Sequence, residues 1–225
     1  KAIKITKGLD LKLYGEPTPE VVETFVSEYA LKPKDFIGLT PKLLIEEGER
    51  VKAGTPLFYA KGKEKVLFTS PVSGVVKQVK RGEKRVIEEV IVSADETIEY
   101  LDFGVSSISE LNAEQIKEKM LISGAWTLLR QRPYSVVPNP DTTPKCIIVS
   151  GFSSAPLAPD YSILLKGLGA ELQVGVDALK KMTGVTIHVN VPSQNVRAEE
   201  LTKLQNVQIN TFEGKHPCGN VSVQI

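Results

Sequence analysis

The sequence has few of the residues from which redox and metal centres are usually built. It contains two cysteines, Cys146 and Cys218, and two histidines, His188 and His216. No cysteine cluster is present for an iron–sulfur centre. His216 and Cys218 lie close together, but nothing in the sequence supplies a third or fourth zinc ligand. Because no secretion signal is visible, the distant cysteines are expected to be free thiols rather than a disulfide.

Net charge and long apolar runs are also scarce. The 225 residues carry a net charge of +1, with 41% hydrophobic and 24% charged residues. A near-neutral chain without a basic block argues against nucleic acid as a partner. No apolar run approaches the roughly 20 residues of a membrane-spanning helix, and residues 1–5 lack the apolar core of a signal peptide. We therefore expect a soluble protein on the cytosolic side.

The stretch that organises the chain is 43–92, in which short Val- and Phe-rich runs alternate with turn residues. Residues 65–69 and 74–79 partly alternate apolar and polar side chains, which is typical of half-buried strands. Glycines and prolines recur between them and permit tight turns. The spacing predicts a small closed or sandwiched β unit over 36–100, preceded by an N-terminal arm over 1–35.

Helical patterns begin after residue 102. Asn112 and Gln115 form a capping-box pair at a helix start, and the helix is expected to end near Gly124. A second helical stretch over 125–131 is halted by Pro133. The segment 101–144 is therefore a helical region that ends in a proline-rich linker.

From residue 145 the pattern predicts a partial Rossmann-like unit that continues beyond residue 225. Strands are expected at 146–149, 186–191 and 207–212, with helices over about 158–182, interrupted near Gly167, and over 197–204. Such a βαβαβ order implies a parallel sheet with right-handed crossovers. Residues 221–225 have the composition of a further strand. The fold class is thus a multidomain α+β and α/β chain.

A dinucleotide site in this unit would need a glycine fingerprint after its first strand. Only Gly151 follows that strand, and the second strand ends near Asn190 rather than at an acidic residue. A dinucleotide is therefore not expected here. The sequence also offers no catalytic centre.

The densest polar and aromatic cluster in the sequence surrounds Trp126. It continues through Arg130 and Arg132 to Tyr134. A flat aromatic surface beside guanidinium donors suits a planar ligand with carbonyl groups, or an acidic partner. The alternative is that Trp126 packs in the core while the arginines bind backbone carbonyls at a domain seam.

The β unit resembles the biotinyl/lipoyl barrel-sandwich domain, whose halves follow the patterns EGxxVxxGxPL and SPxSGxV. Residues 47–57 and 70–76 carry those patterns here. In carrier domains a modified lysine lies on the hairpin between the halves, near the position of Lys63. The neighbours of Lys63 match neither carrier box, so a solvated turn is the alternative.

Across nearly its whole length, the chain resembles the N-terminal half of the A subunit of the bacterial Na⁺-translocating NADH:quinone oxidoreductase. The matching segments are 7–11, 36–41, 68–74, 81–85, 123–127, 130–135, 156–158 and 216–219. The pair Ser154-Ala155 departs from the family pattern, and we assign that loop no role.

The resemblance implies a peripheral, cytoplasmic-side component of a membrane complex that pumps Na⁺ and passes electrons from NADH to quinone. It implies no covalently bound cofactor, other subunits of the complex as partners, and quinone as substrate. The quinone-linked segments of the family correspond to Phe36 and Leu39 and to Arg130, Arg132 and Tyr134. We expect Phe36, Leu39 and Tyr134 to offer apolar surface, and Arg130 or Arg132 to bind a quinone carbonyl.

Two other classes of function stay open. One is a related electron-transport subunit of the Rnf type, which shares the barrel-sandwich unit but carries cysteine clusters further along its chain. The other is a structural docking module whose surfaces serve only partner subunits.

Overall fold

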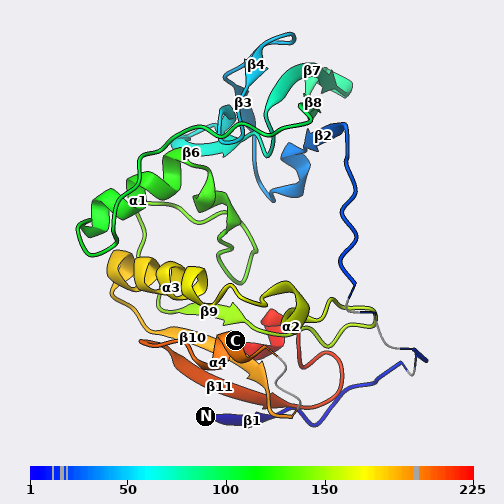
Figure 1. Ribbon diagram of the computed structural model, residues 1–225, viewed down its shortest axis with the longest axis vertical. Helices are drawn as coiled ribbons and strands as arrows, with labels where there is room; N and C mark the ends of the chain where they lie inside the picture. The colour runs from blue at the N-terminus through cyan, green and yellow to red at the C-terminus, as the bar shows by residue number, and fades with distance from the viewer. Residues whose placement is uncertain (12, 16–17, 19, 195–197) are drawn as a thin grey trace. The chain divides into compact units, whose positions relative to one another are not determined.

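The computed structural model describes residues 1–11, 13–15, 18, 20–194 and 198–225 (Figure 1). The chain divides into two compact units: Val22–Thr142, and Lys1–Val21 together with Thr143–Ile225. The residues predicted as a single arm, 1–35, are thus divided between the two units. Residues 101–142 of the predicted helical segment and linker belong to the same unit as the β strands.

The unit Val22–Thr142 contains two antiparallel sheets that form the barrel-sandwich. One sheet has the order β2 (Glu28–Leu31), β8 (Ile87–Ala94), β7 (Gly74–Arg81) and β4 (Arg50–Val51), and the other has the order β3 (Pro41–Leu43), β5 (Pro56–Ala60) and β6 (Lys63–Thr69). Both sheets contribute to the buried core, with Phe58 and Phe68 from one sheet and Val76, Val90 and Val92 from the other. The strands predicted at 65–69 and 74–79 are confirmed as parts of β6 and β7.

Four helical elements accompany these sheets: η1 (Pro33–Asp35), η2 (Glu83–Arg85), α1 (Ala113–Ile122) and η3 (Ala125–Leu128). The predicted capping box starts α1: Asn112 Oδ1 accepts from Gln115 N, and Gln115 Oε1 accepts from Asn112 N, both at 2.9 Å. The helix predicted over 125–131 is wrong in length and type, because only one 3-10 turn forms. Gln131 N donates to Val136 O instead of continuing the helix.

Gly124 joins α1 to η3 and allows both to contact β6. Its φ of +79° is left-handed, a conformation that side chains other than glycine adopt rarely. A Cβ at this position would lie 2.3 Å from Thr69 Oγ1 on β6. Glycine is therefore required here both by the backbone conformation and by the close approach.

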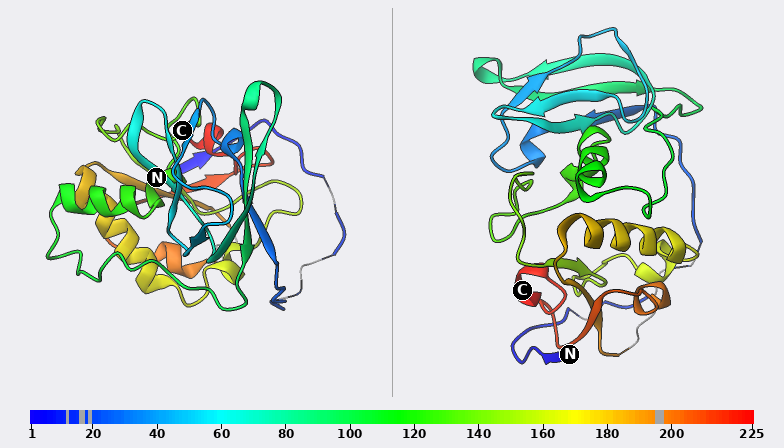
Figure 2. Two further views of the ribbon diagram at one scale, coloured as in Figure 1. Left: turned by 90° about the horizontal axis from the view of Figure 1, so that it is seen from above. Right: turned by 90° about the vertical axis from the view of Figure 1, so that its left-hand side faces the viewer.

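The second unit is built on a four-stranded parallel sheet in the order β1 (Ala2–Lys4), β11 (Gln208–Glu213), β10 (Ile187–Pro192) and β9 (Ile147–Ser150). α2 (Tyr161–Leu164) and α3 (Gly169–Thr183) connect β9 to β10, and α4 (Glu199–Thr202) connects β10 to β11. Figures 1 and 2 show α3 along one side of the sheet, where Val176 packs with Val189 and Leu201. The predicted βαβαβ order is confirmed, including the break near Gly167.

Two features of this unit differ from the sequence-based expectations. The strand predicted over 221–225 is wrong: these residues form the helical turn α5 (Val221–Gln224), which places the Gln224 side chain against Asn190. β1 joins the sheet as an edge strand parallel to β11, a pairing that no local pattern indicates. Arg197, at the start of the helix predicted over 197–204, lies outside the described residues. None of the described helices has the length and apolar character needed to cross a bilayer.

Candidate ligand-binding surface

The structure brings Phe36 and Arg130 together in the unit Val22–Thr142. Phe36 follows η1, and its ring meets the edge of Phe68 at 4.7 Å between centroids; Phe68 in turn stacks on Phe58 at 4.9 Å. The guanidinium carbon of Arg130 lies 5.3 Å from the centroid of the Phe36 ring. An aromatic ring, fixed by two buried phenylalanines, therefore supports a cation.

The guanidinium of Arg130 is also held from the side by backbone carbonyls. Its Nη1 donates to the carbonyl oxygen of Thr127 and to that of Leu129, the latter at 3.0 Å. Arginine carries five N–H donors in a rigid plane. Within the described residues, no hydrogen bond uses its Nε or Nη2, so these donors are available to a carbonyl or carboxylate ligand.

Trp126 lies in the core, as the alternative interpretation proposed. Its side chain is 6% exposed, and its indole Nε1 donates to Pro138 O at 3.0 Å. The binding of Arg130 to backbone carbonyls fits the same interpretation. Trp126 is thus a structural support for η3 and offers no ring face to a ligand.

The other predicted site residues lie nearby in the chain, but only Leu39 is tied to the Phe36–Arg130 pair. Leu39 is half-buried, and its amide donates to Phe36 O at 3.1 Å. Arg132 and Tyr134 project from a loop that is closed by the bridge between Gln131 and Val136. Both side chains are exposed, and in the described part of the chain no hydrogen bond or ring contact joins them to the pair.

Ser154, in the loop to which the sequence assigned no role, organises the segment around His216. Its hydroxyl lies 3.1 Å from His216 Nδ1 and accepts from Gly219 N at 2.8 Å. Asp10 Oδ1 accepts from the backbone N–H of His216 at 2.9 Å, which ties the N-terminal segment to this loop. Cys218 is buried and donates to Gly214 O. These contacts indicate a packing role.

Burial shapes the chemistry of Cys218. It raises the pKa of the Cys218 thiol, the hydrogen bond with Ser154 lowers it, and the charge of Asp10 raises it. The neutral thiol is favoured, whereas a reactive cysteine needs a stabilised thiolate. Across the residues that the structure describes, no group of three His, Cys, Asp or Glu side chains is placed to hold a metal ion.

A chain of buried amides links β11, β10 and α5 in the second unit. Asn210 Nδ2 donates to Asn190 Oδ1 at 2.9 Å, and Asn190 Nδ2 donates to Gln224 Oε1 at 3.2 Å. His188 Nδ1 lies 3.2 Å from Asn210 Nδ2, which explains this histidine as part of a satisfied polar network.

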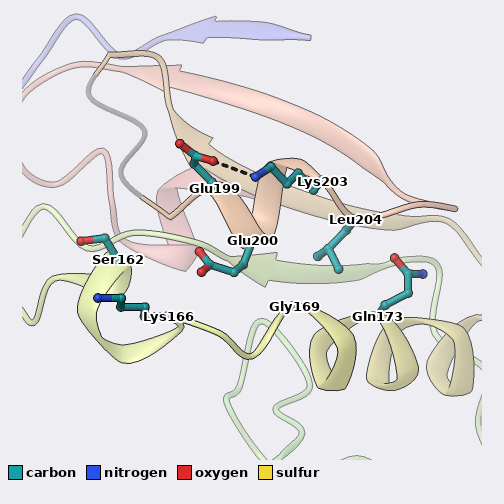
Figure 3. A pocket seen from close by; sticks show the side chains of 8 residues that line it. All are labelled: Ser162, Lys166, Gly169, Gln173, Glu199, Glu200, Lys203 and Leu204. Carbon is teal, nitrogen blue, oxygen red and sulfur yellow. Dashed lines mark hydrogen bonds and ion pairs between the residues drawn. The ribbon is translucent and has the colours of Figure 1, made fainter.

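A pocket of about 450 Å³ lies between α2, α3 and α4 (Figure 3). Three of its charged side chains have partners: Glu199 pairs with Lys203 at 2.7 Å, and Glu200 accepts from the backbone N–H of Gly167 at 3.2 Å. The hydrogen bond between Glu199 and Lys203 lowers the pKa of the glutamate and raises that of the lysine. Gln173 accepts from the backbone N–H of Gln205 at 2.8 Å. The contacts of Glu200 and Gln173 thus tie α4 and the residues after it to Gly167 and α3, whereas the Glu199–Lys203 pair lies within one helical segment.

Lys63, the candidate carrier lysine, is exposed at the start of β6, after the turn at Gly62 with φ of +81°. An exposed lysine at this position is compatible both with modification by an enzyme and with an ordinary solvated turn. The carrier role stays a hypothesis.

A barrel-sandwich β unit and a parallel α/β unit in one chain define the structural class of this protein. Two family models match it: "NqrA N-terminal barrel-sandwich hybrid domain" over residues 3–95 and "NqrA second alpha/beta domain" over residues 111–225. The chain therefore belongs to the NqrA family.

Curated relatives support the same assignment. The A subunits of the Na(+)-translocating NADH-quinone reductases are 36% identical in Serratia proteamaculans and 34% identical in Yersinia pseudotuberculosis, each over 99% of this chain and 50% of the relative. The Neisseria gonorrhoeae protein of the same name is 34% identical over 96% of this chain and 49% of its own length. The chain thus spans about half the length of the curated relatives it matches.

Proposed function

We propose that this chain is part of a peripheral component of a Na⁺-pumping membrane complex that passes electrons from NADH to quinone. In this proposal it lies on the cytoplasmic side of the membrane, binds other subunits, and contributes to quinone binding without a redox cofactor of its own. The names of its relatives support the assignment to such a complex.

The arrangement of Arg130 over Phe36 is the observation that carries the quinone part of the proposal. The ring and two carbonyls fix the guanidinium, so little side-chain freedom is lost when its free N–H groups meet a quinone carbonyl. Exposed apolar side chains lie close to both residues in sequence: Ile37, which follows Phe36, is 59% exposed, and Leu128, two positions before Arg130, is 79% exposed. A planar ring could lie on such a surface with its carbonyl directed at Arg130.

Titration of the chain with a water-soluble, short-chain ubiquinone analogue tests this proposal. Arg130→Ala removes a charge-assisted hydrogen bond, so the dissociation constant should rise about 10- to 100-fold. Arg130→Lys keeps the positive charge and should restore part of the affinity. Arg132→Ala is the matched control, because Arg132 does not contact Phe36, and it should change the affinity less than about threefold.

Circular dichroism must show that each variant is folded. Equal affinity of the wild-type chain and Arg130→Ala would refute the role of Arg130. If the wild-type chain fails to bind the analogue at all, the docking-module alternative is favoured. In that alternative, the exposed side chains of Ile37, Leu128 and Tyr134 contact a partner protein.

A further inference from the structure

The hairpin that joins β7 to β8 presents a cluster of cations that the proposed quinone site does not use. Arg81, Lys84 and Arg85 are exposed at its end, and the Val86 side chain beside them is 59% exposed. Both views in Figure 2 show this end of the hairpin projecting from the sheets. Three cations and Glu83 give residues 81–86 a net charge of +2, and the Glu88 carboxylate lies beside the turn at Gly82, so the hairpin end keeps an excess of positive charge.

The turn is held in a defined and unfavourable conformation. Lys84 and Arg85 have φ values of 53° and 61°, in the left-handed region that costs about 1–2 kcal/mol for a residue with a side chain. Backbone bonds close the turn: Gly82 N donates to Val86 O at 2.9 Å, and Val86 N donates to Glu83 O at 3.1 Å. The backbone therefore presents the cations in a fixed arrangement.

The cations at the end of the hairpin differ from those along its strands. Lys77 pairs with Glu28, and Lys80 lies 3.8 Å from Glu89. Arg81 donates only to Arg85 O, at 3.4 Å, among the described residues. The side chains of Lys84 and Arg85 make no hydrogen bond or ion pair with any residue that the structure describes. Both charges are therefore free to bind an external anion.

We propose that this hairpin end binds the surface of an anionic phospholipid bilayer. Lys84, Arg85 and Arg81 would bind lipid phosphates, while the Val86 side chain would enter the boundary between headgroups and acyl chains. Mobile headgroups can adapt to separated cations. A protein partner would usually need a larger surface with aromatic anchors, and this turn has none. The lipid surface is therefore the better match.

Co-sedimentation of the chain with vesicles tests this proposal. Vesicles of phosphatidylcholine with and without phosphatidylglycerol are compared at about 0.01 M salt, where charges act over roughly 30 Å. The chain should sediment with the anionic vesicles only. Each cation near such a surface contributes roughly a fivefold factor, so Lys84→Asn with Arg85→Asn should lower the partition coefficient about 30-fold. Asparagine tolerates positive φ, so the turn is expected to keep its shape.

Lys61→Asn with Lys63→Asn is the matched control, because it removes two exposed lysines from another hairpin of the same unit. This variant should keep at least about a third of the wild-type partition coefficient. Val86→Ser should weaken binding while leaving the charge unchanged. The proposal would be overturned by equal binding to neutral and anionic vesicles, or by equal losses of the partition coefficient in the two double variants. An acidic protein partner would then be the favoured ligand of the turn.

Discussion

Replacement of Gly124 by alanine tests how tightly η3 is packed on the barrel-sandwich. Two penalties add at this position. The left-handed backbone costs about 1–2 kcal/mol for a residue with a Cβ. The new Cβ would lie 2.3 Å from Thr69 Oγ1, and relief of such an overlap costs about 1–3 kcal/mol. Gly124→Ala should therefore lower the free energy of unfolding by about 2–5 kcal/mol.

Gly38 provides the matched control for the backbone term. Its φ is +75°, and no atom lies within 4 Å of the position that a Cβ would occupy. Gly38→Ala should therefore cost only about 1–2 kcal/mol. Urea unfolding followed by the fluorescence of Trp126, the single tryptophan, reports on the unit that contains both glycines.

A double-mutant cycle with Thr69→Ala isolates the steric term. Removal of the threonine hydroxyl and methyl groups should recover about 1–3 kcal/mol of the Gly124→Ala loss, after correction for the single Thr69→Ala variant. Gly124→Ala and Gly38→Ala could instead destabilise equally, with no coupling to Thr69. That result would show that the close contact between η3 and β6 is not formed.

Two further predictions concern other parts of the chain. Asn112→Ala removes the capping box of α1 and should lower the free energy of unfolding by about 1 kcal/mol in the same urea assay. The control Glu118→Ala, on the exposed face of α1, should change it by less than about 0.5 kcal/mol. Similar losses in both variants would contradict a stabilising role of the cap. Because burial raises the pKa of Cys218, the stability linked to its neutral thiol is fully present below the ordinary thiol pKa of about 8.5 and is lost as pH rises through the raised value. At about pH 8, below the ordinary thiol pKa, a thiol reagent should therefore modify half-buried Cys146 first and Cys218 only upon unfolding. Rapid modification of both cysteines in the folded chain would show that Cys218 is accessible.

Local sequence patterns were sufficient for much of the fold. Asn112 and Gln115 predicted the start of α1, because a capping box depends on residues three positions apart. The barrel-sandwich strands β6 and β7 and the parallel strands β9, β10 and β11 were also predicted, because alternation and apolar runs indicate burial along a short segment. The strand predicted over residues 221–225 was wrong, because five residues with alternating apolar and polar side chains are compatible with either a strand or one helical turn.

The candidate site was predicted only as separate residues. The sequence indicated Phe36, Leu39, Arg130, Arg132 and Tyr134, but it could not indicate that Arg130 lies over Phe36 while Trp126 is buried. That contact depends on where η3 packs against β6, and hence on the close approach at Gly124.

By itself, the sequence determined the two kinds of unit and the scarcity of metal- and cofactor-binding residues, because both follow from composition and short-range spacing. Only the tertiary structure decided that β1 pairs with β11, that Ser154 meets His216, and that Asp10 reaches a backbone amide 206 positions away. The free energy of such contacts depends on the packing of whole elements, and no local pattern of residues records it.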